Sequence, residues 1–148
     1  MSMKKIWGFV ILAMLCLNYK KAFAYEYKKV EPKVFEEPQK IRCTCYCEHG
    51  LTCTGEKTRY GIVAGRKEWI GYVAEVNRMN EDGSIGEFIG FFEFQDTGAG
   101  MDSNGDGKGD TIKNGTSIDI WVDSLADAYA WVGEYGDYVY IKIIKGDG

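Results

Sequence analysis

The chain has 148 residues, 45% of them hydrophobic and 27% charged, with 19 glycines, 2 prolines and a formal net charge of −4. Such a length and composition indicate one small globular domain with a buried core. They exclude a wholly disordered chain, a collagen-like repeat and a protein with several membrane spans.

Residues 1–24 have the three-part layout of a secretory signal peptide. Lys4 and Lys5 precede an apolar run over residues 6–17, and Ala22-Phe23-Ala24 places small residues where a signal peptidase cleaves. The run is shorter than the roughly 20 residues that span a bilayer. We therefore expect cleavage after Ala24 and a secreted or cell-envelope protein, with an uncleaved membrane anchor as the alternative.

Removal of residues 1–24 changes the charge, because they carry four lysines and no acidic residue. The mature chain keeps 14 basic and 22 acidic residues, a formal charge of 14 − 22 = −8. Nucleic-acid affinity comes mainly from basic side chains that neutralise phosphates. We therefore expect no nucleic-acid partner, and contact with a membrane only through an uncleaved signal segment.

Short apolar runs separated by turn residues dominate the chain from residue 41 onward, after an extended linker predicted over residues 25–40 that holds both prolines. Asn80-Glu81-Asp82-Gly83 predicts a hairpin turn. The predicted strands are Ile41–Cys47, Tyr60–Ala64, Ile70–Asn77, Phe88–Gln95, a strand around Ile118–Val122, and Tyr138–Ile144.

One helix is predicted, over residues 124–135, with Ser124 as its N-cap and Gly136 at its end. Leu125, Ala128, Tyr129 and Val132 recur at helical spacing, which supports the helix. About six short strands with one late helix favour an all-β fold, a small closed barrel over residues 41–148, rather than a parallel α/β sheet.

Two aspartates lie on or beside predicted strands. Phe88, Gly90, Phe92 and Phe94 share one parity that Asp96 continues, whereas Asp119 alternates with Ile118, Ile120 and Val122. Two carboxylates that meet in a cleft can hold one proton between them, and the protonated group can then act as a general acid. An aspartate before glycine is more often simple turn chemistry.

Six short motifs occur in an order that resembles a known family. They are Arg42-Cys43-Thr44-Cys45-Tyr46, Thr52-Cys53-Thr54-Gly55, Tyr60-Gly61-Ile62-Val63-Ala64, Asp96-Thr97-Gly98, Ile112-Lys113-Asn114-Gly115 and Ile118-Asp119-Ile120-Trp121. Over residues 41–144 this set resembles the Asp-Asp-Asp (3D) domain family. That family is similar to the catalytic barrel of membrane-bound lytic transglycosylase A and to rare lipoprotein A barrels.

The resemblance implies a six-stranded double-psi β-barrel that acts on peptidoglycan glycan strands and requires no cofactor. Asp119 would serve as the single acid and base that cleaves between N-acetylmuramic acid and N-acetylglucosamine and leaves a 1,6-anhydro sugar, with Asp96 in support. The residues expected along the substrate cleft are Lys113, Asn114, Trp121, Thr97, Gly98 and Tyr46. Trp121 shares strand parity with Asp119, whereas most other aromatic side chains are expected in the core.

The sequence departs from the family pattern at the first aspartate, where the best match places Ala64 or Gly65. A missing carboxylate is compatible with a barrel that binds glycan without cutting it. A non-catalytic glycan-binding module is therefore the main alternative. A third reading is a surface module, stabilised by cysteines or calcium, whose partner is another protein.

An insertion between Gly98 and Ile112 contains oxygen side chains at alternate positions and a glycine at the sixth, as in the first half of an EF-hand loop. Its candidate calcium ligands are Asp102, Asn104, Asp106 and Asp110. Lys113 occupies the twelfth position, where such loops carry a bidentate carboxylate. A flexible acidic surface loop is the alternative.

Four cysteines, Cys43, Cys45, Cys47 and Cys53, follow the signal segment. Disulfides are the first interpretation for an exported domain, and Cys47 with Cys53 is the easiest pair. A zinc site, a nucleophile paired with His49, and reduced thiols are the alternatives.

Overall fold

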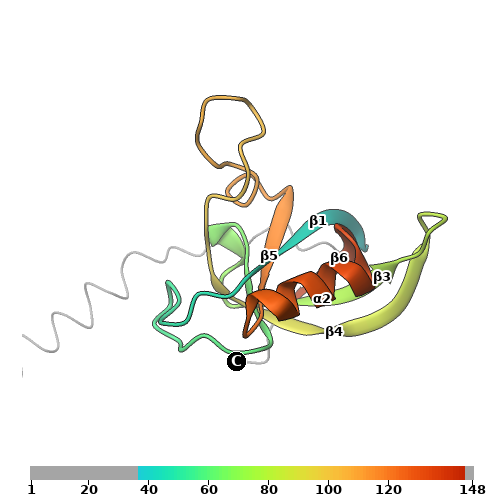
Figure 1. Cartoon of the computed structure of the whole chain (residues 1–148), viewed down its shortest axis with the longest axis horizontal. Helices are drawn as coiled ribbons and strands as arrows, with labels where there is room; N and C mark the ends of the chain where they lie inside the picture. The colour runs from blue at the N-terminus through green and yellow to red at the C-terminus, as the bar shows by residue number, and fades with distance from the viewer. Residues whose placement is uncertain (1–36, 146–148) are drawn as a thin grey trace, which may run out of the picture. The chain divides into compact units, whose positions relative to one another are not determined.

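The computed structural model describes residues 37–145, which all belong to one compact unit. The predicted signal peptide and residues 25–36 of the predicted linker lie outside the described residues. The elements are β1 (Gln39–Tyr46), β2 (Ile62–Ala64), the 3₁₀ helix η1 (Lys67–Trp69), β3 (Tyr72–Met79), β4 (Ile85–Asp96), β5 (Ser117–Trp121), α2 (Leu125–Tyr135) and β6 (Tyr138–Lys145) (Figure 1).

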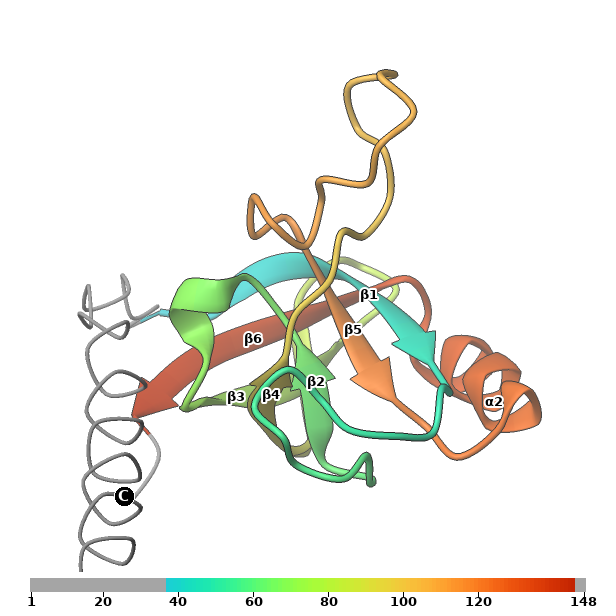
Figure 2. The same ribbon diagram turned by 90° about the vertical axis from the view of Figure 1, so that its left-hand side faces the viewer.

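The six strands close into one ring in the order β1-β5-β2-β4-β3-β6, and β6 pairs again with β1. Two neighbouring pairs, β1 with β5 and β2 with β4, are parallel, and the remaining pairs are antiparallel. Figure 2 shows β1, β5 and β2 side by side with β6 behind them. The predicted closed all-β barrel with one short helix is confirmed for residues 37–145.

Alternating aliphatic side chains fill the ring. Val139, Ile141 and Ile143 of β6 are fully buried, as their common parity predicts, and so are Ile118 and Ile120 of β5.

The predicted turn joins β3 to β4, where the Gly83 N–H donates to the Asn80 carbonyl at 2.9 Å. Gly83 has φ 82°, a conformation that side chains with a Cβ rarely adopt.

The predicted single apolar face of the fourth strand is wrong at Phe88. Phe92 and Phe94 are buried, but Phe88 is 52% exposed. A bulge explains the difference, because Val76 pairs with Gly90 and Asn77 with Phe88, which leaves Ile89 without a partner on β3. The extra residue reverses the parity, so Ile89 rather than Phe88 packs against the core.

The predicted helix is confirmed, and its ends lie where the sequence places them. The Ser124 hydroxyl accepts a hydrogen bond from the Asp127 N–H at 3.1 Å, and the chain leaves the helix at Gly136 with φ 75°. Leu125 is 60% exposed and Tyr129 72%, whereas Trp131 is buried. The helix packs through its largest aromatic side chain, a choice that apolar spacing alone does not determine. Within residues 37–145 no helix has the length and hydrophobicity needed to cross a membrane.

Candidate functional site

Asp119 lies in the middle of β5, between β1 and β2. It pairs with Thr44 on the β1 side and with Ala64 on the β2 side. Its chain neighbours Ile118 and Ile120 are fully buried. Because side chains alternate along a strand, Asp119 points to the face opposite the core, as the sequence predicts.

The Asp119 carboxyl group is an unusually weak acid for an aspartate. Burial, together with the negative charges of Glu48 and Asp96, raises its pKa to about 6. The Thr44 hydroxyl, which donates to Asp119 Oδ1 at 2.9 Å, acts in the opposite direction. Asp119 can therefore hold or release a proton close to neutral pH.

Asp96 ends β4 and is held by three donors. Its Oδ1 accepts from the N–H groups of Cys53 at 3.1 Å and Thr97 at 2.9 Å, and its Oδ2 accepts from the Tyr46 hydroxyl at 3.1 Å. The carboxylate thus fixes the start of the segment 97–100 and the loop that contains Cys53. It also adds negative charge near Asp119.

Ala64 is the register partner of both aspartates, Asp119 on β5 and Asp96 on β4. A bulge makes this possible, because Val63 pairs with Phe94 and Gln95 is passed over. The predicted apolar-face placement of Asp96 is therefore corrected: the bulge takes it out of the parity of Phe94. Paired residues point to the same face of a sheet, so Asp96 and Asp119 share one face. Their Cα atoms are two strand spacings apart, roughly 10 Å.

The structure distinguishes Ala64 and Gly65, the two positions that best match the first aspartate of the resembled family. A Cβ at Gly65 would lie 2.5 Å from the Phe94 ring and 2.9 Å from the Trp69 ring. Gly65 therefore has no room for any larger side chain. Ala64 lies between Asp119 and Asp96 on the sheet. Because its side chain is a methyl group, no third negative charge stands between the two carboxylates.

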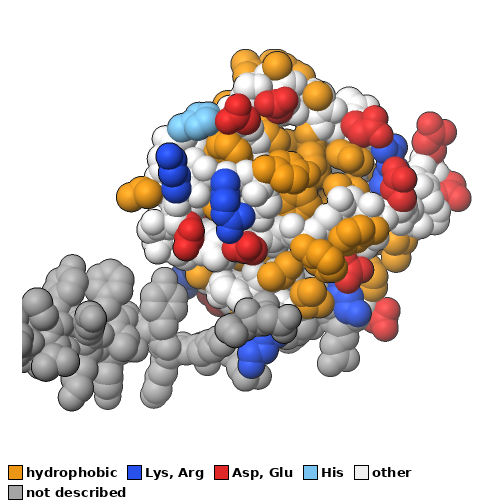
Figure 3. Space-filling view, turned by 90° about the horizontal axis from the view of Figure 1, so that it is seen from below, with side chains coloured by type: hydrophobic (Ala, Val, Ile, Leu, Met, Phe, Trp, Pro, Cys, Tyr) orange, Lys and Arg blue, Asp and Glu red, His pale blue; other side chains and the backbone are white. Residues whose placement is uncertain are grey.

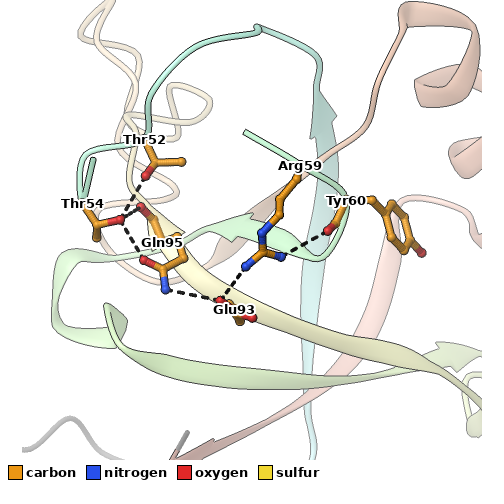
Figure 4. Close-up of polar contacts among 6 residues, drawn as sticks. All are labelled: Thr52, Thr54, Arg59, Tyr60, Glu93 and Gln95. Atoms are coloured by element: carbon orange, nitrogen blue, oxygen red, sulfur yellow. Dashed lines mark hydrogen bonds and ion pairs between the residues drawn. The ribbon is translucent and has the colours of Figure 1, made fainter. Parts of the chain in front are cut away.

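The loop over residues 48–60 is tied to β4 by a polar network (Figure 4). The Thr54 hydroxyl donates to Gln95 Oε1 at 2.7 Å, and Arg59 pairs with Glu93 at 3.0 Å. Gln95 and Glu93 are linked in turn at 3.4 Å. The network holds the loop so that the Cys53 N–H meets Asp96.

A cleft of about 460 Å³ lies beside the end of β4 and the turn before β5. It is lined by Lys67, Glu68, Thr97, Gly98 and Lys113. Glu68 pairs with Arg66 at 3.0 Å, while no ion pair within residues 37–145 engages Lys67 or Lys113. The cleft is therefore a local basic site on a domain whose described residues carry more acidic than basic side chains.

Three predicted cleft residues, Thr97, Gly98 and Lys113, meet in this cleft, and Tyr46 contacts Asp96. Asn114 is placed differently, because its side-chain oxygen accepts from Thr116 in a turn. The indole of Trp121 is buried and donates to the Glu48 carbonyl at 2.9 Å. Trp121 lines a second cavity beside α2, not the cleft with Lys113.

The loop over residues 102–110 uses its oxygen side chains to bind its own backbone. Asp102 accepts from the N–H groups of Asn104, Gly105 and Gly107, and these bonds lower its pKa. Asp110 accepts from the Ser103 hydroxyl at 2.8 Å. No group of three or more His, Cys, Asp or Glu side chains in residues 37–145 is arranged to hold a metal ion. The calcium site stays a prediction.

All four cysteines of the described residues are free thiols, so the predicted Cys47–Cys53 disulfide is not formed. Cys43 is buried in the core. Burial and the nearby Asp119 charge raise the pKa of Cys45 to about 12. Such thiols are poor nucleophiles because the reactive form is the thiolate.

Sequence reasoning missed Thr44 as a partner of Asp119 and Lys67 as a second lysine of the cleft. Thr44 stands 75 positions from Asp119, and only the register of β1 with β5 joins them. No local sequence signal marks either residue.

Comparison of the chain with family models, with curated proteins and with solved structures finds no match.

Proposed function

We propose that this protein is an exported enzyme of the lytic transglycosylase type that cuts peptidoglycan glycan strands. The proposal rests on the Asp119 side chain. This carboxyl group lies half-buried on the outer face of the barrel, and its pKa is raised to about 6. A group of this kind can donate a proton to a leaving oxygen and then recover one.

Asp119 performs both proton transfers in the proposed reaction. As an acid it protonates the oxygen between N-acetylmuramic acid and N-acetylglucosamine, and the glycosidic bond breaks. As a carboxylate it then takes the proton from the muramic acid 6-hydroxyl, whose oxygen closes on the anomeric carbon. The product is a 1,6-anhydro sugar, no water is consumed, and Asp119 returns to its protonated form.

Neighbouring groups support both protonation states of Asp119. The Thr44 hydroxyl donates to the ionised carboxylate. It also lies 3.3 Å from the Ile118 carbonyl, so it can donate there when Asp119 holds its proton. Burial is the main cause of the raised pKa of Asp119, and the negative charge of Asp96 adds to it by disfavouring the ionised form.

The cleft with Lys67 and Lys113 suits a glycan that carries carboxylates. Peptidoglycan strands bear lactyl-linked peptide stems with acidic groups, and an ammonium group attracts a carboxylate. Thr97 and Gly98 bring the same cleft next to Asp96 along the chain. We propose the glycan strands as the partner and the cell envelope as the location. No cofactor and no nucleic acid enter the proposal.

The finer fold assignment belongs to the same proposal. Two parallel pairs in a six-stranded ring, β1 with β5 and β2 with β4, support a double-psi β-barrel. In this arrangement the row from Thr44 through Asp119 and Ala64 to Asp96 crosses four adjacent strands.

A non-catalytic glycan-binding barrel is the second candidate, and Ala64 favours it. A methyl group stands between the two aspartates where the resembled family carries a carboxylate. The two functions differ in one observable, since only an enzyme releases soluble anhydro-muropeptides.

The test is incubation of the full-length protein with purified peptidoglycan and analysis of the products by mass spectrometry. We expect anhydro-muropeptides from the wild type and none from Asp119→Asn, which keeps the shape of the side chain. Pelleting of the folded protein with the glycan, without soluble products, would instead identify a binding module.

A further inference from the structure

The second cavity lies on the α2 side of the barrel and has no part in the proposed reaction. Its volume is about 400 Å³, within the range of sites for small ligands. Its lining residues are Tyr60, Trp121, Val122, Asp123, Asp127, Ala130, Trp131, Glu134 and Tyr135. Four of these are aromatic, three are acidic and none is basic.

The acidic residues are brought together by the helix. Asp127 and Glu134 are seven positions apart, which is two helical turns, and Asp123 precedes the helix on the same side. In the space-filling view, hydrophobic side chains fill a hollow and acidic side chains stand at its margin (Figure 3). The lining therefore combines an aromatic floor with a negative rim.

Two of the three carboxylates have no lysine or arginine as a partner among the described residues. Glu134 pairs with Arg78, but Asp127 accepts only from the neutral Ser124 hydroxyl and the Asp123 carboxylate lies 3.7 Å from His49. No lysine or arginine within residues 37–145 forms an ion pair with Asp123 or Asp127. A ligand can therefore approach both carboxylates without displacing a lysine or an arginine.

One cation of this chain already uses the same chemistry at the edge of the cavity. The Arg78 guanidinium lies 5.1 Å from the centre of the Tyr135 ring and pairs with Glu134. An aromatic ring face with a carboxylate beside it attracts organic cations, because the ring quadrupole and the anion act together. The remaining rings and carboxylates offer a second place of the same kind.

We propose that this cavity is a binding site for an alkylammonium group, with the carbon chain on the aromatic floor and the ammonium at Asp123 and Asp127. Such a group occurs in free polyamines and in lysine side chains. The site is independent of the proposed glycan chemistry, because neither Asp119 nor Asp96 lines it.

The test follows the indole N–H signals of the full-length protein by NMR during titration with n-pentylammonium chloride and, as a neutral match, n-pentanol. We expect saturable shifts of Trp121 and Trp131, no shift of Trp69, and binding of the ammonium about tenfold tighter than of the alcohol. Nα-acetyl-lysine methylamide and cadaverine then distinguish a lysine side chain from a free diamine by which binds more tightly.

Variants locate the charge that is responsible. Asp123→Asn and Asp127→Asn each weaken pentylammonium binding several-fold, and asparagine keeps an acceptor oxygen for the Ser124 hydroxyl. Glu81→Gln removes one exposed charge from the hairpin turn and leaves the affinity unchanged. Equal affinity for ammonium and alcohol, stronger shifts with N-acetylglucosamine, or no shift of Trp121 and Trp131 in folded protein overturns the proposal.

Discussion

Thr44 donates a hydrogen bond of 2.9 Å to Asp119 from the neighbouring parallel strand, and the two residues are direct register partners. This bond opposes the burial and the acidic neighbours that raise the pKa of Asp119. The pair therefore sets how readily Asp119 ionises. Because β1 and β5 are neighbouring strands of the ring, strand pairing rather than a flexible loop holds Thr44 beside Asp119.

Thr44→Val removes the donor with little change in shape, so we expect the pKa of Asp119 to rise from about 6. A hydrogen bond to a charged group is worth about 1.5–3 kcal/mol, which corresponds to about one pKa unit or more. NMR titration of the Asp119 carboxyl carbon measures the shift. Thr116→Val, in the exposed turn before β5, should leave that titration unchanged, and an unchanged value in Thr44→Val would contradict the assignment.

The raised pKa of Asp119 makes the folded protein less stable as the pH rises. The unfolded carboxyl ionises near pH 3.8 and the folded one near pH 6, so the unfolded chain releases its proton first in this interval. Below this interval both the folded and the unfolded state hold the proton, so Asp119 does not lower the stability. Above it the loss levels off at about 3 kcal/mol at most.

Asp119→Asn removes this pH-dependent loss, because the amide does not ionise. Chemical denaturation should show the variant more stable than the wild type at about pH 7.5, by about 1–3 kcal/mol, with the difference gone at about pH 3.5. Equal stability at both pH values would show that Asp119 is not held in a neutral form by burial. Asp137→Asn, at an exposed position after the helix, is the matched control.

Asp96→Ala leaves the N–H groups of Cys53 and Thr97 and the Tyr46 hydroxyl without their acceptor. We expect a loss of about 1–3 kcal/mol of unfolding free energy and faster amide hydrogen exchange at Cys53 and Thr97. Exchange limited to these two segments separates a positioning role from general unfolding. Unaltered exchange at both amides would refute the role of Asp96 in holding the loop.

Gly65→Ala tests whether the position after Ala64 can carry a side chain. The added methyl group would lie 2.5 Å from Phe94, so we expect the free energy of unfolding to fall by about 1–3 kcal/mol. Gly133→Ala is the matched control, since nothing lies within 4 Å of its added carbon. In a helix that change should stabilise by up to about 1 kcal/mol. A neutral Gly65→Ala would show that the Phe94 and Trp69 rings adapt.

Much of the fold could be predicted from the sequence because strand parity and turn residues are local signals. The ends of α2 and the hairpin at Gly83 follow from the residues that form them. The β4 bulges at Ile89 and Gln95 could not be predicted, since each depends on which residues the partner strand offers. They decide where Phe88 and Asp96 lie.

The candidate site likewise contains residues that local sequence predicts and residues that it does not. Asp119 could be placed on the outer face from its own strand, and Thr97, Gly98 and Lys113 could be grouped by their motifs. Thr44 and Lys67 could not, because ring closure rather than nearby sequence brings them to the site. Trp121 shares the parity of Asp119, but its indole turns to the Glu48 carbonyl and the α2 side.

The most direct test of the proposed function is the product analysis of peptidoglycan incubated with wild type, Asp119→Asn and Asp137→Asn at equal concentration. We expect 1,6-anhydro-muropeptides from the wild type and from Asp137→Asn, and at least about a hundredfold less product from Asp119→Asn, as for removal of a general acid. Equal product release by Asp119→Asn, or products with hydrolysed reducing ends only, would contradict it.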